Sequence, residues 1–350
     1  MKGLILCAGR GTRLHPFSYS QPKTLLPVAN HPVLHYCIQK LIEVGIRDIG
    51  IVINPAQTQI IDFVGDGSRY PATITFIEQD QPLGIAHAVR LARPFIQHEP
   101  FMLLLGDNLL MDSLRDLHRI FHQSPADGVL LLSEVERPQD YGIVEVKDGR
   151  IITVEEKPQY PKSNLAAIGA YVFTPAIFKV IESLQPSARG EYEITHAIQA
   201  LVDQGSQIKH IVTDGLYSDV GTIQRWLSAN RWMLEHELGE QPKVGASSKV
   251  INCQLIGPVL IGENCYIENC KVGPYVSIQD SVELKNCNWI KQSILLESSS
   301  LIDVDWVIED SLFGRSSQLT GQHSAETGVF ILSDKSSILI SGARKQRAKP

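Results

Sequence analysis

The sequence has no long uninterrupted apolar stretch and no excess of basic residues. No window approaches the roughly 18 consecutive apolar residues that a membrane-spanning helix needs, and the apolar start, residues 1–8, runs into a glycine-rich loop instead of a cleavage site. The formal net charge is -6, and the basic residues cluster only at the end of the chain, at Arg344, Lys345, Arg347 and Lys349. We therefore expect no membrane span, no secretion signal and no nucleic-acid partner.

Cysteine is sparse and follows no ligand pattern. The six cysteines show no CxxC pair and no histidine at zinc-ligand spacing: Cys7, Cys37, Cys253, Cys265, Cys270 and Cys287. Free thiols in a reducing cytosol are expected, and hence a cytoplasmic protein. With 43% hydrophobic and 20% charged residues in a chain of 350, the composition is that of a globular protein too long for one ordinary core.

The first 230 or so residues alternate short apolar runs with helical patterns. The predicted strands are residues 3–7, 49–53, 73–78, 101–105, 128–133 and 167–173. Between the first two, residues 33–44 place Leu34, Ile38 and Leu41 on one helical face. This pattern predicts an α/β fold, with a mostly parallel Rossmann-like sheet that carries helices on both faces.

In the last third of the chain, an aliphatic residue recurs at every sixth position. The series is Val244, Val250 and Ile256, then Ile261 and Ile267 after a five-residue slip, then Val272, Ile278, Leu284, Ile290, Leu296, Ile302 and Ile308 after another. A triangular coil with one short strand per face gives this period, with each aliphatic residue pointing inward. The expected domains are a catalytic domain at 1–235, a left-handed β-helix of hexapeptide repeats at 244–313, and a C-terminal extension at 314–350.

A glycine-containing loop follows the first predicted strand. It reads G-x-G-T-R-L-x-P from Gly9, and P-K-x-L-L-P-V follows from residue 22. Glycines there let the backbone approach a phosphate chain, and Arg13 and Lys23 can neutralise its charge. The loop matches neither the Walker pattern nor the dinucleotide pattern. Gly9, Gly11, Thr12, Arg13 and Lys23 are the predicted nucleotide-binding residues of this loop.

These two motifs resemble the sugar nucleotidyltransferase family, and within it the long form of the glucose-1-phosphate thymidylyltransferases. The resemblance runs through most of the chain. It implies a nucleotidyltransferase sheet, Mg²⁺ as cofactor, and transfer of a nucleotide from a nucleoside triphosphate, dTTP, to a sugar 1-phosphate, glucose 1-phosphate. The products would be dTDP-glucose and pyrophosphate, formed by in-line attack on the α-phosphorus.

Two aspartates match the metal segments of this family. Asp107 follows the apolar run 101–105, at the end of a strand where open α/β sheets bind ligands. Asp219 lies in Y-S-D-V-G-T, where the family more often has W-L-D-T-G. The resemblance implies that both bind Mg²⁺, which suits a site of one or two carboxylates plus phosphate oxygens and water.

Gln79 and Gly84 match the family segment that reads the nucleobase. An amide that presents a donor and an acceptor together would suit the imide edge of thymine or uracil, and Gly84 would let the ring lie against bare backbone. Gln81 is close enough in sequence to compete with Gln79 for this role.

The sugar-phosphate side is indicated by the tyrosine–glycine pair at 141–142, the E-K-P segment and the glycine of strand 167–173. The resemblance implies that Glu156 binds sugar hydroxyls and that Lys157 binds the sugar phosphate, while Asp107, Gly142, Gly169 and Tyr171 complete the site. Residues 189–195 also resemble a family segment near the sugar, without assignable roles.

Catalysis would then consist of alignment and charge neutralisation by Arg13, Lys23, Asp107, Lys157 and Asp219.

One alternative keeps the fold but uses UTP with glucose 1-phosphate, or GTP with mannose 1-phosphate. Another is a hexapeptide-repeat acyltransferase, which the absence of histidine between His236 and His323 disfavours. A silent regulatory subunit would require loss of Lys23, Asp107 or Asp219. The solenoid favours a homo-oligomer.

Overall fold

The computed structural model describes residues 1–65, 67–321 and 327–340, and the chain divides into two compact units. The first comprises Met1–Gly11, Gln21–Leu25 and Val33–Val220. The second comprises Thr12–Ser20, Leu26–Pro32 and the chain from Gly221 onward. The two sequence motifs near the N-terminus are therefore shared between the units. The basic residues from Arg344 to Lys349 lie outside the described residues.

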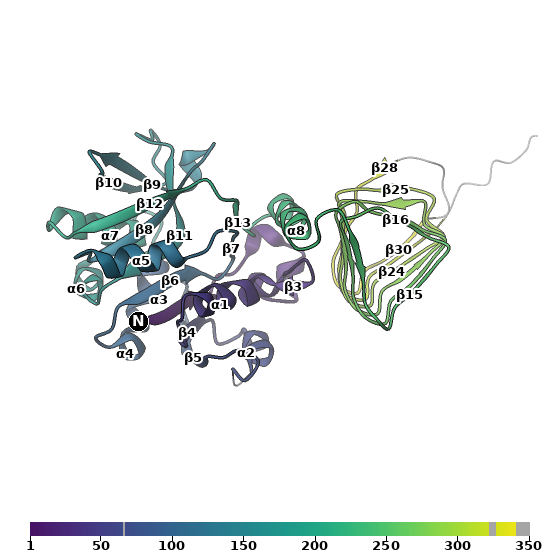
Figure 1. The fold of residues 1–350 in the computed structure, drawn as a ribbon, viewed down its shortest axis with the longest axis horizontal. Helices are drawn as coiled ribbons and strands as arrows, with labels where there is room; N and C mark the ends of the chain where they lie inside the picture. The colour runs from purple at the N-terminus through teal and green to yellow at the C-terminus, as the bar shows by residue number, and fades with distance from the viewer. Residues whose placement is uncertain (66, 322–326, 341–350) are drawn as a thin grey trace, which may run out of the picture. The chain divides into compact units, whose positions relative to one another are not determined.

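The first unit is built on a mixed, mostly parallel sheet. Within the described residues it has nine strands, with β10-β9-β11-β6-β1-β4-β5 as the main order and with β8 joining β11 to β12 (Figure 1). Strand β1 is parallel to β4 and β6, whereas β11 is antiparallel to β6 and β8. The strands are β1 (Lys2–Leu6), β4 (Asp48–Ile53), β5 (Thr73–Glu78), β6 (Phe101–Leu105), β8 (Gly128–Glu134), β9 (Gly142–Lys147), β10 (Arg150–Glu156), β11 (Leu165–Phe173) and β12 (Ile208–Thr213).

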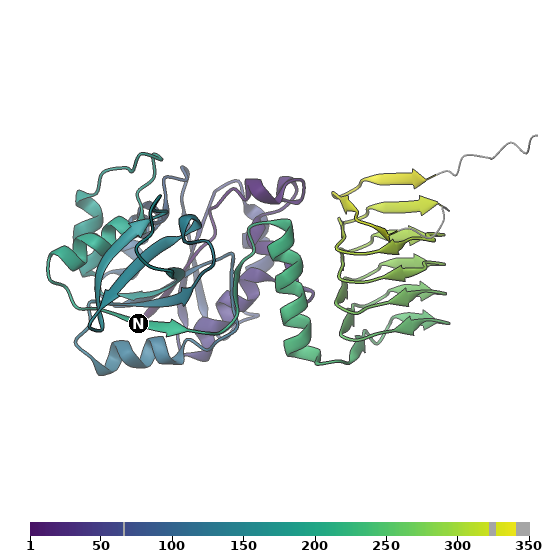
Figure 2. The same ribbon diagram turned by 90° about the horizontal axis from the view of Figure 1, so that it is seen from above.

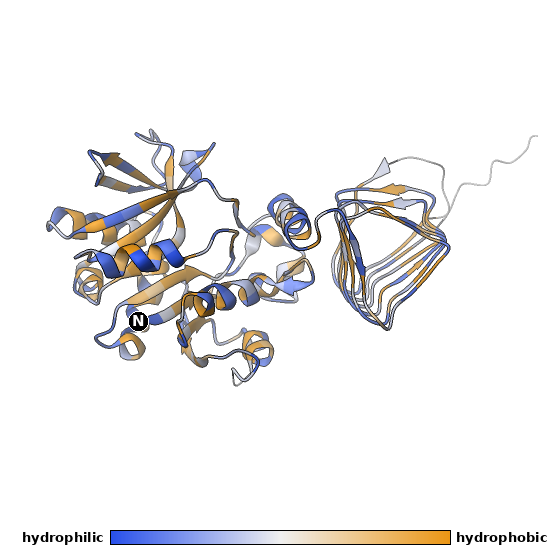
Figure 3. Cartoon of the chain, viewed as in Figure 1, coloured by the Kyte–Doolittle hydropathy of each residue, from blue (hydrophilic) through white to orange (hydrophobic). Residues whose placement is uncertain are grey.

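Helices cover both faces of this sheet, as predicted. Leu4 belongs to a buried cluster with residues of α3, α6 and α7, whereas a side chain on the neighbouring Gly3 would meet Leu41 of α1 on the opposite face. Hydrophobic colour runs along the central strands in Figure 3, because strands buried on both faces need apolar residues at every position. The helices of the unit are α1 (Val33–Glu43), α2 (Thr58–Val64), α3 (Ile85–Leu91), α4 (Arg93–Ile96), α5 (Arg115–Gln123), α6 (Ala176–Ser183) and α7 (Ile194–Asp203).

The last third of the chain forms the predicted β-helix, with three sheets of short parallel strands (Figure 2). The first sheet holds β14 (Pro242–Val244), β17 (Val259–Ile261), β20 (Val276–Ile278), β23 (Ile294–Leu295), β26 (Leu312–Phe313) and β29 (Ile331–Leu332). The second holds β15 (Lys249–Ile251), β18 (Tyr266–Glu268), β21 (Glu283–Lys285), β24 (Ser300–Ile302), β27 (Gln318–Gly321) and β30 (Ser337–Ile340). The third holds β16 (Gln254–Leu255), β19 (Lys271–Val272), β22 (Trp289–Ile290), β25 (Val307–Ile308) and β28 (Thr327–Gly328). Strands β27 to β30 thus extend the sheets into the range expected to be a C-terminal extension.

The inward-facing positions differ from the strict six-residue series at three places. The predicted series named Ile256, Leu296 and Ile302. In the structure, the residue before each of them is the one in register with the stacked residues of the neighbouring coils: Leu255, Leu295 and Leu301. Leu301 is fully buried between Leu284 and Leu319, whereas Ile302 is half-buried. The reason is coil length: Ile267, Leu284 and Leu301 follow one another at 17 residues, one fewer than three six-residue repeats.

The corners of the coils are held by a ladder of side-chain amides. Asn252, Asn269, Asn286 and Asp303 all have positive φ, which Asn and Asp tolerate better than most residues. Each amide nitrogen donates to the oxygen of the next rung, at 2.6, 2.9 and 2.7 Å. Successive rungs are 17 residues apart, so the ladder joins equivalent corners of successive coils.

Helix α8 (Ile223–Leu238) links the β-helix to residues 26–32, which include the end of the second motif. The fully buried Trp226 donates from Nε1 to the carbonyl of Pro27 at 2.6 Å. The Asn230 Oδ1 accepts from the Ala29 amide and from the Ser277 hydroxyl, each at 2.9 Å. Residues 26–32 are thus held against both α8 and the solenoid. None of the helices formed by the described residues is long and apolar enough to cross a membrane.

Adjacent residues of β24 provide a test of the coil register. We expect Leu301→Ala to destabilise the protein by about 3 kcal/mol, because it opens a cavity in the stacked core. Ile302→Ala should cost less than about 1 kcal/mol, since that side chain is half-buried at the surface. Urea unfolding followed by tryptophan fluorescence measures both, and equal losses would contradict the register.

Candidate functional site

The carboxyl ends of two neighbouring parallel strands bring Lys23 and Asp107 together. Strands β1 and β6 pair along their whole length, so the loops after Leu6 and Leu105 leave the same edge of the sheet. There the Lys23 ammonium forms an ion pair with Asp107 Oδ2, and the two side chains are only 19% and 14% exposed. Such a partly buried, charged pair at the ligand-binding edge of an α/β sheet marks a candidate active site.

Gly9 makes room for this ion pair. A Cβ atom on Gly9 would lie 2.8 Å from Cε and 3.0 Å from Nζ of Lys23. Any side chain at Gly9 would therefore push the end of the Lys23 side chain away from its present position. Gly11 has φ of 65°, a left-handed conformation that ends the first unit's part of the loop.

Asp219 reaches the same edge through a two-stranded ribbon. Strand β13 (Tyr217–Asp219) pairs antiparallel with β7 (Asn108–Leu110), with Asp219 opposite Asn108. The Val220 amide donates to the Asp107 carbonyl at 2.8 Å. The structure thus brings the backbone of both predicted metal-binding aspartates together, although they are far apart in sequence.

Two carboxylates agree with the donor set that Mg²⁺ prefers when phosphates and water complete its coordination. Among the described residues, no group of three or more His, Cys, Asp or Glu side chains could hold a metal ion.

Cys7 packs behind the ion pair and is chemically silent. Burial raises the pKa of its thiol to about 12, and the negative charge of Asp107 adds a smaller contribution in the same direction. A hydrogen bond with Thr24 has the opposite effect and lowers the pKa. A side chain on Gly106 would lie 2.6 Å from the Cys7 sulfur. A neutral, enclosed thiol is not a nucleophile at neutral pH, so the site is not a cysteine-based one.

The predicted base-reading residues lie after β5 and at the start of α3. Gln79 is only 4% exposed, and its Nε2 lies 3.4 Å from the Gly84 carbonyl and 3.0 Å from His87 Nδ1. Gly84 has φ of 102° and presses against the backbone of Tyr192, so only glycine fits there. Gln81 is exposed. Sequence reasoning missed His87, although its position three residues after Gly84 places it in the first turn of α3.

On the sugar side, the structure brings Gly142 and Glu156 together as partners in the β9–β10 pair. Glu156 accepts hydrogen bonds from Thr195 Oγ1 at 3.2 Å and from Arg189 at 3.1 Å, and Lys157 Nζ lies 3.8 Å from its carboxylate. A Cβ atom on Gly142 would lie 2.5 Å from the Thr195 methyl group. The segment 189–195, which had no assigned role, therefore orients the Glu156 carboxylate.

Gly169 and Tyr171 differ in their surroundings. Gly169 has φ of 75°, and a Cβ atom on it would lie 2.3 Å from the amide nitrogen of Asn108, which connects it to the Asp107 edge. Tyr171 is 3% exposed and stacks with Phe173 in the core, and burial raises the pKa of its hydroxyl. The structure gives Tyr171 a packing position.

Thr12 and Arg13 lie exposed in the 3-10 helix η1 (Thr12–Leu14), which belongs to the second unit. Their binding to phosphate stays a prediction from the sequence.

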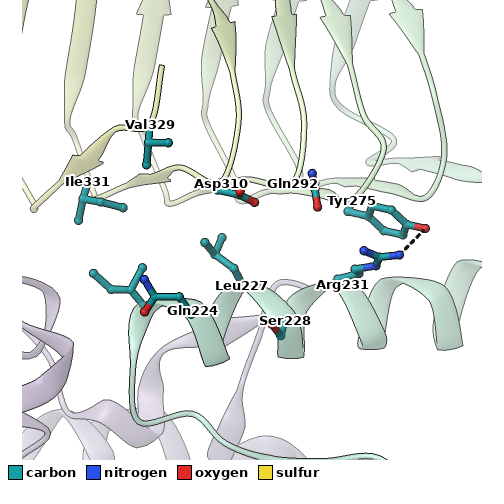
Figure 4. Close-up of a pocket in the computed structure, with 10 residues that line it drawn as sticks. Gln224, Leu227, Ser228, Arg231, Tyr275, Gln292, Asp310, Val329 and Ile331 are labelled. Atoms are coloured by element: carbon teal, nitrogen blue, oxygen red, sulfur yellow. Dashed lines mark hydrogen bonds between the residues drawn. The ribbon is translucent and has the colours of Figure 1, made fainter. Parts of the chain in front are cut away.

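The second unit also has a hollow of about 460 Å³ between α8 and the solenoid, where the Arg231 guanidinium lies over the Tyr275 ring at 4.3 Å (Figure 4). None of the predicted site residues lines this hollow.

Gly9→Ala tests the packing of the ion pair. The added methyl group must displace the Lys23 ammonium from Asp107, so we expect turnover to fall by about tenfold to a hundredfold, as for a small misplacement of a catalytic group. Because Gly9 has no positive φ, the unfolding midpoint should change little. Steady-state kinetics and thermal melting check both parts, and unchanged turnover would count against a role for this contact.

Comparison with known proteins identifies the family. A model of the nucleotidyl transferase family matches residues 2–236. A glucose-1-phosphate thymidylyltransferase of Streptomyces antibioticus is 39% identical over 280 residues, which are 75% of this chain and 78% of the relative. The UTP–glucose-1-phosphate uridylyltransferase AglF of Haloferax volcanii is 38% identical over 224 residues, 63% of this chain and 91% of the relative. A candidate glucose-1-phosphate thymidylyltransferase of Bacillus anthracis, solved in complex with sucrose, superposes with a TM-score of 0.64 at 32% identity and covers 69% of this chain and 98% of its own. By these matches, the chain belongs to the sugar nucleotidyltransferase family.

Proposed function

We propose that the protein converts dTTP and glucose 1-phosphate to dTDP-glucose and pyrophosphate. The observation that carries this proposal is the Lys23–Asp107 pair beside Gly9, with Asp219 joined to the same edge of the sheet. A lysine, two carboxylates and a glycine turn are groups suited to a polyphosphate. The thymidylyltransferase relatives at 38–39% identity over 75% of the chain support dTTP as the nucleotide.

The reaction needs no strong base, because the nucleophile is an oxygen of the sugar phosphate, which is already anionic. The obstacle is the approach of two anions, so positive charge and alignment lower the barrier. Lys23 would bind the nucleotide phosphates, and the sequence motif offers Arg13 as a second phosphate-binding residue. Lys157, which neighbours Glu156, would offset the charge of the sugar phosphate.

Asp107 and Asp219 are the residues that would hold Mg²⁺. When bound, the ion supplies further positive charge to the phosphates. In this structure the Lys23 ammonium is paired with the Asp107 carboxylate.

Gln79 and Gly84 would hold the nucleobase, and Gly142 with Glu156 would hold the hexose. Thr195 and Arg189 fix the Glu156 carboxylate before the sugar binds, which lowers the entropy cost of ordering it. UTP is the second candidate nucleotide, because AglF, a uridylyltransferase, covers 63% of the chain at 38% identity.

Loss of either member of the ion pair tests the proposed chemistry. We expect Lys23→Ala and Asp107→Asn each to lower turnover by roughly a hundredfold or more, as removal of one preorganised charged group does. Arg93→Ala is a matched control: it breaks the exposed ion pair between Arg93 and Glu182, 58% and 51% exposed, and should leave turnover unchanged. Near-normal turnover of either active-site variant would remove that residue from the mechanism.

A substrate panel tests the reaction itself. Pyrophosphate release is measured for dTTP, UTP, GTP and CTP, each with glucose 1-phosphate and with mannose 1-phosphate. The highest kcat/KM is expected for dTTP with glucose 1-phosphate, and EDTA should abolish activity until Mg²⁺ is restored. A higher kcat/KM for UTP than for dTTP would make UTP the nucleotide substrate. Absence of pyrophosphate release with every pair of substrates would refute the proposed function.

A further inference from the structure

The Gln79 amide has no free donor in this structure. Its nitrogen carries two hydrogens and lies near two acceptors, the Gly84 carbonyl at 3.4 Å and the His87 ring at 3.0 Å. The residue is 4% exposed, so neither hydrogen has easy access to solvent. Only the amide oxygen is left to meet a ligand. This differs from the sequence-based interpretation, in which Gln79 offers a donor and an acceptor together.

The orientation of the amide follows from its neighbours. The Gly84 carbonyl only accepts, so the group that faces it must be the amide nitrogen. The same nitrogen faces His87 Nδ1, which must then be the unprotonated ring nitrogen of a neutral imidazole. Burial, and then the charge of Arg90, lower the pKa of His87, while a hydrogen bond to the backbone of Gln81 opposes them. A neutral ring with its hydrogen on Nε2 leaves Nδ1 free to accept from the Gln79 amide.

Packing holds His87 in this position. His87 is 9% exposed, and its ring lies 6.3 Å from the Tyr192 ring, over which the Arg90 guanidinium lies at 5.3 Å. The backbone of Tyr192 is tied to the loop before α3, since Ala86 donates to its carbonyl at 3.0 Å and its amide donates to Leu83 at 2.7 Å. The histidine therefore stands in a rigid frame and cannot turn freely.

We propose that His87 is a positioning residue that sets nucleobase specificity: its Nδ1 holds the Gln79 amide so that only the amide oxygen faces the base. This inference rests on the proposed function, in which Gln79 contacts the base. A fixed acceptor opposite N3 selects a base that presents an N–H group at that position, and the amino group of cytosine lies at N4 instead. The imides of thymine and uracil present N3–H, whereas cytosine presents an unprotonated N3 that repels the oxygen. His87 thus excludes cytosine nucleotides, and it does not separate dTTP from UTP.

Three substitutions of His87 test this role, because they differ in whether and where they offer a hydrogen-bond acceptor to the Gln79 amide. His87→Leu removes the acceptor, His87→Gln moves it outward, and His87→Asn keeps an oxygen close to the place of Nδ1. We expect KM for dTTP to rise about tenfold in the first two variants, the effect of one buried hydrogen bond, with a smaller change in kcat. Discrimination against CTP should fall by a similar factor. His87→Asn should restore most of both quantities. His122→Leu, at an exposed histidine on α5, should change nothing.

The outcomes separate this inference from the proposed function. If the wild-type protein releases no pyrophosphate from any nucleotide, the proposed function fails. If it turns over dTTP while all three variants keep its KM and its discrimination against CTP, the role of His87 is refuted and the proposed function stands. Thermal melting shows whether His87→Leu folds. If it does not, the comparison of His87→Asn with His87→Gln decides, since equal KM values would overturn the inference.

Discussion

The candidate site depends on the parallel pairing of β1 with β6. Because the two strands run in the same direction in register, Gly9 and Asp107 leave the sheet side by side, and Lys23 can join them. The charge pair is largely shielded from water, so its energy depends on the sheet being formed and on Gly9 having no side chain. The other site residues are placed with respect to this edge: Asp219 through the β7–β13 ribbon, and Gly169 through its contact with Asn108.

The segment from Gly9 to Pro32 shows how the two units share a functional element. Residues 21–25, with Lys23, belong to the first unit, whereas the residues before and after them belong to the second. Asn230 on α8 holds the Ala29 amide and the Ser277 hydroxyl of the solenoid with one buried oxygen. A buried polar group with satisfied hydrogen bonds specifies one arrangement of its neighbours. The solenoid and residues 26–32, which belong to the same unit, are therefore joined through one side chain of α8.

Much of the fold could be predicted because its patterns are local. The six strands predicted in the first unit are present, since apolar runs between turn residues are typical of a buried parallel sheet. The solenoid was predicted from its period, and its register was wrong only where the coil shortens. Counting six residues per face could not reveal that Leu301, and not Ile302, points inward, because only the strand pairing shows the five-residue step from Ile290 to Leu295 that shifts the register.

The sequence by itself determined the family, the two-part organisation and the identity of the charged groups, because motifs and periods are carried by neighbouring residues. Only the tertiary structure decided which of those groups meet. Register placed Asp219 opposite Asn108, and packing placed Tyr171 in the core. The donors of the Gln79 amide are engaged by Gly84 and by His87, a residue that no motif singled out. What a polar side chain offers to a ligand depends on which of its hydrogen bonds the protein has already made, and that is set by contacts in the folded chain.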